Sequence, residues 1–425
     1  MQIPELYELY LAHPGIATDT RKLKPGEIFF ALKGPNFNGN KFAAAALEAG
    51  AAFAIVDEYN GPHDNRIIQV PDVLNCLQEL AKFHRMKLYI PVIAITGSNG
   101  KTTTRELVHE VLSSTYTICT TRGNLNNHIG IPLTLLSIGK DAEMAVIEMG
   151  ANHQNEIASY CEYVLPTHGI ITNCGKAHLE GFGGEEGVRK GKGELFDQLR
   201  ITKGMAFVMK DYPYLLEMAK GIPGIMTYGT HDANITGHVI DGSGFLEIAI
   251  TNGAAIGRIK TQMVGEYNLP NILAAVTVGK HFNIEENKIK QALENYIPSN
   301  SRSQLVQMGT NRVILDAYNA NPTSMKAAIE NFARMEGGEK VLLIGGMMEL
   351  GNDSIAEHSA IIELIGKYTW KAVALVGQDY HETPHPYLRF SNAAEAKEWL
   401  DHQQFSHIQL LVKGSRSMQM EKVLE

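Results

Sequence analysis

The stretch VIAITGSNGKTTTRE, from Val92 to Glu106, decides how this chain of 425 residues is organised. Its apolar beginning is typical of a buried strand, and the residues after the second glycine continue as a helix. A glycine-containing loop joins the two: Gly97, Ser98, Asn99, Gly100, Lys101, Thr102 and Thr103. Such a loop directs backbone N–H groups and the positive end of a helix dipole towards one point, which suits an anion. The stretch therefore predicts a site for the phosphates of a nucleotide.

The residue types in this loop fit phosphate chemistry. Gly97 and Gly100 permit backbone angles and a close approach that a Cβ would prevent. Lys101 can reach the β- and γ-phosphates of a nucleotide, and the hydroxyl of Thr102 can ligate Mg²⁺. The common phosphate loop has its first glycine where this chain has Ile95, so the match is to a shorter loop with the same GK[ST] end. The alternative is a glycine-rich turn with a solvated lysine, but GKT between a strand and a helix is too specific for that.

The composition limits the class of protein. Hydrophobic residues make up 44% and charged residues 20% of the chain, as expected for a globular protein in water. The net charge of -8 argues against broad nucleic-acid binding, which needs a basic face. No apolar run reaches the length of a membrane span, and the N-terminus shows no secretory signal. The scattered cysteines favour reduced thiols in the cytoplasm and no zinc site: Cys76, Cys119, Cys161 and Cys174.

The first half of the chain mixes strand and helix patterns. Before the loop, the sequence predicts strands at 26–34 and 51–58 and helices at 40–50 and 73–86. From there apolar strands alternate with helices, which indicates a parallel sheet covered on both faces. The predicted strands of that sheet lie at 90–96, 145–150, 168–175 and 205–210.

The pattern changes twice in the second half. Residues 222–265 are rich in β-branched residues and glycine turns, which predicts a small antiparallel sheet, and a helix follows at 268–282. A linker rich in proline, serine and asparagine is expected at 296–304. Beyond it, four apolar runs alternate with helices and predict a second open sheet: RVILDAY, KVLLIGG, AVALVG and IQLLVKG.

These patterns predict an α/β protein of three domains. The first is a small α/β domain over residues 1–84, and the second is a central domain with the phosphate loop and its parallel sheet over 85–298. The third, over 299–425, has a C-terminal Rossmann-like sheet. The boundaries follow the changes of pattern described above.

Three further motifs carry a resemblance to a known family. They are DAYNANPTSM at 316–325, MMELG at 347–351 followed by His358, and KGSRSM at 413–418. With the GxxGKTT form of the loop, they make nearly the whole chain resemble the Mur ligases, ATP-dependent amide-forming enzymes of peptidoglycan synthesis. The motifs are most similar to those of the member that adds D-alanyl-D-alanine to UDP-N-acetylmuramoyl-tripeptide. The Asp-Asn-Pro-Arg type motif of the member that adds the third amino acid is not found.

The resemblance implies a ligase reaction. ATP would phosphorylate a peptide carboxylate, and an incoming amine would attack the acyl phosphate, so cations are expected to dominate the site. The first domain would hold the UDP end of the acceptor, the second ATP and Mg²⁺, and the third would bring residues to the nucleotide and receive the dipeptide. The implied partners are the two substrates, without nucleic acid, and the implied state is a cytoplasmic monomer.

The resemblance also implies a set of metal ligands. Thr102 and Glu148, at the end of a predicted strand, would bind Mg²⁺, and His178 would bind a second metal ion. Lys192 resembles a lysine that reacts with CO₂ to form a carbamate (N6-carboxylysine), which requires a partly desolvated amine or nearby cations. Lys190, two residues away, is the other candidate for this role. The alternative is that Lys192 is an ordinary surface lysine.

Further matches imply nucleotide contacts. Asn268 and Asn271 would contact the nucleotide and nearby main chain, and Tyr267 replaces the usual histidine and would stand beside adenine. Arg302 would reach the ATP phosphates, and Asp316 would bind the ribose. Capping or a solvated surface is the alternative for these polar side chains. The implied catalytic set is Lys101, Glu148, His178, Lys192, Asn268 and Arg302.

Three polar segments are expected to contact the substrates. The N-terminal turn would meet uridine or diphosphate, a loop of amide side chains would orient phosphate or peptide groups, and two C-terminal basic residues would meet substrate or phosphate. Turn capping competes for the amides, and a solvated turn competes for the basic residues. In that order, the residues are Asp19, Thr20 and Arg21; Asn124, Asn127 and their neighbour Asn126; and Lys413 and Arg416.

Two other functions stay open from the sequence. One is another amide ligase of the same superfamily, of the third-residue-adding or folyl-polyglutamate type. The other is a nucleotide-binding switch that does not ligate, whose sign would be ATP hydrolysis independent of any amine. The implied second metal site argues against a switch.

Overall fold

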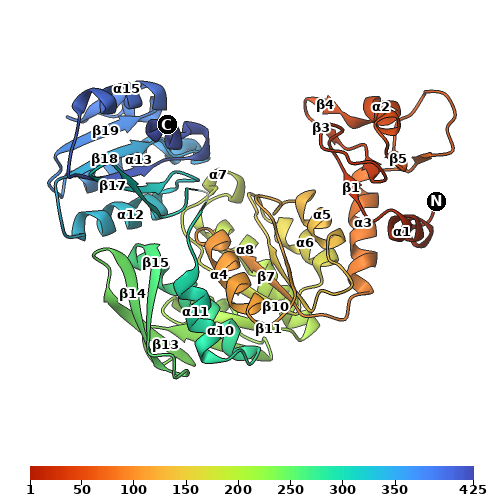
Figure 1. Cartoon of the computed structure of the whole chain (residues 1–425), viewed down its shortest axis with the longest axis horizontal. Helices are drawn as coiled ribbons and strands as arrows, with labels where there is room; N and C mark the ends of the chain where they lie inside the picture. Colours follow the sequence, from red (N-terminus) through yellow and green to blue (C-terminus); the bar gives the residue numbers. More distant parts are fainter. Residues whose placement is uncertain (300) are drawn as a thin grey trace. The chain divides into compact units, whose positions relative to one another are not determined.

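The computed structural model describes residues 1–299 and 301–425 (Figure 1). Asn300, which falls in the predicted linker 296–304, lies outside the described residues. The chain forms two compact units and passes between them several times. The first unit comprises Met1–Ala94, Tyr116–Gly150 and Glu156–His168, and the second comprises Ile95–Thr115, Ala151–Asn155 and Gly169–Glu425.

The N-terminal part of the first unit is made of α1 (Ile3–Ala12), β1 (Ile16–Ala17), β2 (Ile28–Phe30), β3 (Lys33–Gly34), β4 (Phe37–Asn38), α2 (Ala43–Glu48), β5 (Phe53–Val56) and β6 (Ile67–Gln69). Four strands form a parallel sheet in the order β1-β2-β5-β6, and β3 pairs with β4 in a hairpin. All of β2 is buried, and Phe29 shares a small core with Ala43 and Ala46 of α2. The helix predicted at 40–50 begins as a 3₁₀ turn, and Gly50 follows it with φ +101°.

The rest of the first unit contains α3 (Val73–Met86), the start of β7 (Val92–Thr96), β8 (Ile118–Thr120), α5 (Gly130–Leu136), β9 (Met144–Glu148) and α6 (Glu156–Val164). Within this unit the strand order is β7-β9-β8. The Asp72 carboxylate caps α3 by accepting the N–H of Asn75 at 2.7 Å, and α3 packs against α1, α5 and α6. The helix predicted at 73–86 is confirmed.

The central part of the second unit contains the end of β7, α4 (Lys101–Ser113), β10 (His168–Ile171), α7 (Leu179–Phe182), α8 (Glu185–Thr202), β11 (Met205–Met209), α9 (Pro213–Met218), β12 (Gly224–Gly229), β13 (Ile235–Asp241), β14 (Phe245–Asn252), β15 (Arg258–Val264), α10 (Leu269–His281) and α11 (Glu286–Asn295). Here the strand order is β15-β14-β13-β12-β11-β10-β7. Strands β13, β14 and β15 are antiparallel, as predicted for 222–265, whereas β12 pairs parallel with β11 and β13. Helices α10 and α11 both pack against α4.

The C-terminal part of the second unit contains β16 (Gln304–Met308), β17 (Asn311–Asp316), α12 (Pro322–Arg334), β18 (Lys340–Gly345), α13 (Ser354–Ile365), β19 (Ala372–Val376), α14 (Gln378–Glu382), β20 (Leu388–Phe390), α15 (Ala393–Gln403) and β21 (Gln409–Lys413). The strand order is β16-β17-β21-β18-β19-β20, and every pair is parallel except β16 with β17. The four predicted strands are confirmed. The edge strand β16 was missed because QLVQM has no long apolar run and is at most half-buried.

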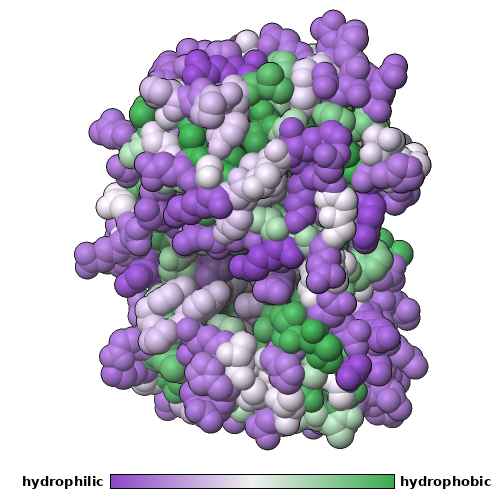
Figure 2. Space-filling model, turned by 90° about the vertical axis from the view of Figure 1, so that its left-hand side faces the viewer, coloured by the Kyte–Doolittle hydropathy of each residue, from purple (hydrophilic) through white to green (hydrophobic). Residues whose placement is uncertain are grey.

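Hydrophilic side chains cover most of the face shown in Figure 2, and apolar residues form small separate groups on it. Isolated apolar residues of this kind are normal on a protein surface in contact with water. Among the residues that the structure describes, none of the helices has both the length and the hydrophobicity that crossing a lipid bilayer requires.

Candidate functional site

The predicted phosphate loop joins the end of β7 to the start of α4, as the sequence indicates. Gly97 has φ +143° and Gly100 has φ +79°, angles that favour glycine. A Cβ on Gly97 would lie 2.0 Å from Thr172 Oγ1, and one on Gly100 would lie 2.6 Å from Asn271 Oδ1. Both glycines are therefore required by backbone angle and by space. Because α4 begins at Lys101, the positive end of its dipole lies at the loop, which suits a phosphate.

The loop is held by the segment that follows β10. The Asn99 N–H donates to Asn173 Oδ1 at 3.1 Å, and Asn173 Nδ2 donates to the Asn99 carbonyl at 3.0 Å. The Ser98 N–H donates to the Asn173 carbonyl at 2.8 Å, and Thr172 Oγ1 donates to the Asn99 carbonyl at 2.6 Å. Sequence reasoning missed Thr172 and Asn173. Their position at the carboxyl end of a predicted parallel strand was a signal that could have identified them.

The side chains of the loop lie close to its own backbone. Lys101 Nζ donates to the Gly97 carbonyl at 2.7 Å and to the Ser98 carbonyl at 3.2 Å. Its ammonium group therefore lies against the loop that is predicted to hold the phosphates. Thr102 is buried and Thr103 is half-buried in the first turn of α4.

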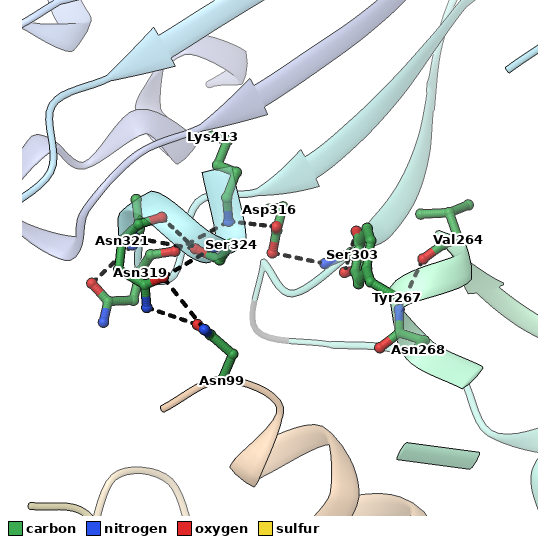
Figure 3. Close-up of polar contacts among 11 residues, drawn as sticks. Asn99, Val264, Tyr267, Asn268, Ser303, Asp316, Asn319, Asn321, Ser324 and Lys413 are labelled. Atoms are coloured by element: carbon green, nitrogen blue, oxygen red, sulfur yellow. Dashed lines mark hydrogen bonds and ion pairs between the residues drawn. The ribbon is translucent and has the colours of Figure 1, made fainter. Parts of the chain in front are cut away.

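Asn268 and Asn271 form a chain of amides beside the loop. Thr104 Oγ1 donates to Asn271 Oδ1 at 3.0 Å, and Asn271 Nδ2 donates to Asn268 Oδ1 at 2.9 Å. Asn268 Nδ2 donates to the Val264 carbonyl at 2.9 Å (Figure 3). Both asparagines are buried, and Asn271 fills the space that a Cβ on Gly100 would need. In this structure they support the loop, and their predicted contact with the nucleotide stays a prediction.

Lys192 lies on α8 with only 1% of its surface exposed, whereas Lys190 is exposed. Its Nζ donates to the Ala151 carbonyl at 3.0 Å and lies 4.8 Å from the centre of the Phe182 ring. The desolvated lysine that carbamate formation requires is therefore found at Lys192. The alternative of an ordinary surface lysine is wrong for this residue.

His178 ends the segment after β10 in a left-handed conformation, with φ +51°. Its Nδ1 contacts the Glu349 carboxylate of the MMELG motif. The hydrogen bond from His178 lowers the pKa of Glu349. The structure therefore links His178 to the C-terminal part of the second unit, and its role as a metal ligand stays a prediction.

Glu148 and the predicted amide residues lie in the first unit. Glu148 is buried at the end of β9, and Asn126 Nδ2 donates to its Oε1 at 2.8 Å. Asn127 Oδ1 accepts the N–H groups of Ile129 and Gly130 at the start of α5. This oxygen therefore caps a turn, which was the alternative to a substrate contact. Asn124 is exposed on the same loop.

Asp316 and Lys413 stand opposite one another on the parallel strands β17 and β21. Lys413 Nζ lies 2.6 Å from Asp316 Oδ2, and the lysine is 1% exposed. The alternative interpretation, that Lys413 lies on a solvated turn, is therefore wrong. Asp316 Oδ1 accepts the N–H of Ser303 at 3.2 Å, and the Ser303 hydroxyl lies 2.9 Å from the Tyr267 hydroxyl (Figure 3). Burial, followed by the charge of Asp316, raises the pKa of Tyr267. The contacts of Asp316 with ribose and of Lys413 with substrate stay predictions.

Arg302 and Arg416 lie near one aromatic ring. The guanidinium carbon of Arg302 lies 3.6 Å from the centre of the Tyr318 ring, and that of Arg416 lies 5.6 Å from it. Arg416 also pairs with Glu421 at 3.2 Å. The structure thus brings together two of the cations that were predicted to meet phosphate or substrate.

The N-terminal turn is built from exposed charges. Arg21 Nη2 lies 2.7 Å from Asp19 Oδ2, and the Arg21 side chain is 86% exposed. The hydrogen bonds from Arg21 lower the pKa of Asp19 to about 2. Thr20 lies half-buried between them. A contact of this turn with UDP stays a prediction.

Comparisons with known proteins agree with this geometry. Three family models match the chain: the Mur ligase family catalytic domain over residues 14–85, the Mur ligase middle domain over 95–279, and the Mur ligase glutamate ligase domain over 301–415.

Curated relatives and a solved structure extend the match. The UDP-N-acetylmuramoyl-tripeptide–D-alanyl-D-alanine ligase of Bacillus subtilis is 38% identical, over 81% of this chain and 76% of its own length. The ligase of that name from Escherichia coli is 35% identical, over 96% of this chain and 92% of its own. A crystal structure of MurF from Acinetobacter baumannii is 30% identical with a TM-score of 0.87 and covers 98% of this chain and 97% of its own. The predicted three-domain α/β architecture is confirmed, and the chain belongs to the Mur ligase family.

Proposed function

We propose that this Mur ligase joins D-alanyl-D-alanine to UDP-N-acetylmuramoyl-tripeptide with the consumption of ATP, in the synthesis of peptidoglycan precursors. The similarity to the Escherichia coli ligase of that specificity over 96% of the chain is the observation that carries the proposal. The phosphate loop between β7 and α4 supports the use of ATP, because its glycines and the start of the helix are built to accept phosphate. We also propose the domain boundaries predicted from the sequence, a cytoplasmic location and a monomeric state.

The reaction has two chemical steps. A peptide carboxylate oxygen takes the terminal phosphoryl group of ATP, which gives an acyl phosphate and ADP. The amine of D-alanyl-D-alanine then attacks the acyl carbon, inorganic phosphate leaves, and the amine loses a proton. Negative charge develops on phosphoryl oxygens in the first step and on the acyl oxygen in the second, so cations near these oxygens accelerate both.

The residues of the chain would divide this work. Lys101 would leave the loop carbonyls and bind the β- and γ-phosphates, and Arg302 would neutralise the charge that develops on them. The carboxylate of Asp316 is proposed to bind the ribose hydroxyls. Water must be kept from the acyl phosphate, since hydrolysis would waste it.

Mg²⁺ would shield the phosphate charges when bound. The proposed ligands are Thr102, Glu148, His178 and a carbamate on Lys192. The oxygen donors in this set fit the ion, because hydroxyl, carboxylate and carbamate oxygens are hard ligands of the kind that Mg²⁺ prefers, whereas the imidazole nitrogen of His178 is a softer donor. The burial of Lys192 supports the carbamate, because a desolvated amine loses its proton more readily.

Phosphate release with defined substrates tests the function. The enzyme with UDP-N-acetylmuramoyl-tripeptide and ATP should release phosphate only after D-alanyl-D-alanine is added. Folate with glutamate should give no release, which separates this activity from a folyl-polyglutamate type ligase. Release without any amine would instead favour a nucleotide switch and would contradict the proposal.

A separate measurement tests the carbamate. Protein equilibrated with ¹³C-labelled bicarbonate should give one protein-bound carbamate signal in the ¹³C NMR spectrum. Lys192→Arg should remove the signal, because a guanidinium does not lose its proton to form a carbamate. Lys190→Arg is the matched control and should keep it. A signal that survives Lys192→Arg would assign the carbamate to another residue.

A further inference from the structure

The side chains of Asn99 and Asn321 meet across a long sequence distance. Asn99 belongs to the phosphate loop, and Asn321 directly precedes α12 in the C-terminal part of the second unit. Asn321 Nδ2 donates to Asn99 Oδ1 at 2.7 Å, and Asn99 Nδ2 points back to Asn321 Oδ1 at 3.4 Å (Figure 3). The two amides therefore connect the phosphate loop to the start of α12, which is far from the loop in the sequence.

A second contact joins the same helix to the support of the loop. The Lys176 N–H donates to Thr323 Oγ1 at 3.1 Å, and a Cβ on Gly175 would lie 2.8 Å from that oxygen. The Gly175 carbonyl in turn accepts the Ser98 hydroxyl at 2.9 Å. The first turn of α12 thus contacts the loop directly through Asn321 and indirectly through Thr323.

Asn321 itself is held firmly. It is 6% exposed, and its Oδ1 accepts the Ser324 N–H at 3.0 Å as the N-cap of α12. The residues just before it are tied to the Asp316–Lys413 pair, because Lys413 Nζ also donates to the Asn319 carbonyl at 3.3 Å. A rigid connection therefore runs from Asp316, the proposed ribose ligand, to Asn99 in the phosphate loop.

We propose that Asn321 is a positioning residue of the ligase. It holds the phosphate loop at a fixed position relative to the C-terminal segment that carries Asp316. The inference rests on the proposed function, in which one ATP molecule contacts both the loop and that segment. Without the bridge, the two halves of the nucleotide site keep their own structures but lose their fixed relation. Catalysis then suffers because misplacement of a reacting group by a small distance slows a reaction strongly.

The test separates the bridge from the helix cap. In Asn321→Ser, a serine still caps α12 but is too short to reach Asn99, so kcat should fall roughly tenfold with a small change in thermal midpoint. Ser324→Ala is the matched control. It removes the hydroxyl that bonds the Asn321 backbone and leaves the amide bridge, so kcat should stay within about twofold of wild type. Asn321→Thr also keeps a cap acceptor and is too short to reach Asn99, and it serves if the serine variant does not fold.

The outcomes are distinct. A folded Asn321→Ser or Asn321→Thr with the kcat of Ser324→Ala overturns the positioning role, as does a loss of thermal stability with kcat unchanged. Combining Asn99→Ala with Asn321→Ser should lower kcat little beyond Asn99→Ala alone, because both remove the same bridge. Lys101→Ala measured alongside reports on the proposed function: if it stays active, the phosphate role of the loop fails whatever the result at Asn321.

Discussion

The phosphate loop, Gly97–Thr103, and the turn Asp19–Arg21 are both predicted to meet phosphate groups, but the chain builds them in different ways. The loop is fixed through its backbone, and Asn173 alone makes three hydrogen bonds to Ser98 and Asn99. The turn is held by local contacts of Asp19, whose carboxylate accepts the Arg21 N–H at 3.0 Å and pairs with the Arg21 guanidinium, and the Arg21 side chain is 86% exposed.

The difference shows where each site obtains its affinity. Backbone N–H groups that are already oriented bind an anion without further ordering, so the loop is preorganised. In the turn, Arg21 must give up part of its bond to Asp19, and both side chains must lose freedom, before a ligand gains from them. Substitutions in the loop should therefore have large effects on catalysis, and substitutions in the turn should have small ones.

The largest effect is expected at Lys101. Lys101→Ala removes the ammonium group that lies against the phosphate loop, and kcat for phosphate release should fall by about 10² to 10³. The fold should persist, because the Nζ contacts of Lys101 are to two carbonyls of its own loop. Exposed Lys220→Ala is the control. Wild-type turnover in Lys101→Ala would show that catalysis does not depend on this cation of the loop.

The next effect is expected at the support of the loop. Asn173→Ala removes both side-chain hydrogen bonds to Asn99, and the affinity for ATP should fall about tenfold in calorimetry. Asn173→Asp keeps the acceptor for the Asn99 N–H but adds a negative charge beside the phosphates, so it should bind ATP more weakly still. Exposed Asn287→Ala should bind as wild type does. Equal affinity in all three would mean that the loop does not depend on Asn173.

The same contrast explains what could be predicted from sequence. The phosphate loop was found because glycine angles and the GKT spacing are local properties of the chain. The Asp316–Lys413 pair was not, because it depends on the register of two strands whose residues are 97 positions apart. The role of Asn321 was missed because its partner Asn99 is 222 positions away in the sequence, although its place before Pro322 is typical of a helix cap. Local backbone chemistry can be predicted from a sequence, whereas side chains that the fold brings together from distant segments cannot.

A smaller effect is expected from pH in the first unit. His84 is buried, with its Nε2 3.0 Å from the Ile138 carbonyl and its Nδ1 3.1 Å from the Tyr7 hydroxyl. Burial lowers the pKa of His84, so the unfolded chain binds a proton at a pH where the folded protein does not. Stability should therefore fall as pH drops below about 6.5, with a slope of at most ~1.4 kcal/mol per pH unit from this residue.

Thermal midpoints measured between pH 5 and 8 check this. His84→Gln should show a shallower decline with falling pH than wild type, while exposed His63→Gln should keep the wild-type decline. Burial also lowers the pKa of His109 and His281, so part of the slope should remain in His84→Gln. A slope unchanged by His84→Gln would show that the proton uptake lies elsewhere.

The smallest effect is expected at the turn, and the chain supplies its own control. Arg66 pairs with Asp64 across one residue, as Arg21 does with Asp19, with the same 2.7 Å distance between Nη2 and Oδ2. In both pairs the arginine lowers the pKa of the aspartate to about 2. Exposed pairs of this kind contribute little to stability, so Arg21→Ala and Arg66→Ala should leave the thermal midpoint nearly unchanged.

The two variants should differ in kinetics alone. If the Asp19–Arg21 turn meets the UDP end of the acceptor, Arg21→Ala should raise the KM for UDP-N-acetylmuramoyl-tripeptide severalfold at low salt and leave kcat unchanged, because it removes binding far from the reacting groups. Arg66→Ala should leave both constants unchanged. Identical kinetics in the two variants would show that the Asp19–Arg21 turn is a solvated ion pair without a role in substrate binding. The phosphate loop would then remain a predicted phosphate site, and the prediction that the Asp19–Arg21 turn contacts UDP would be wrong.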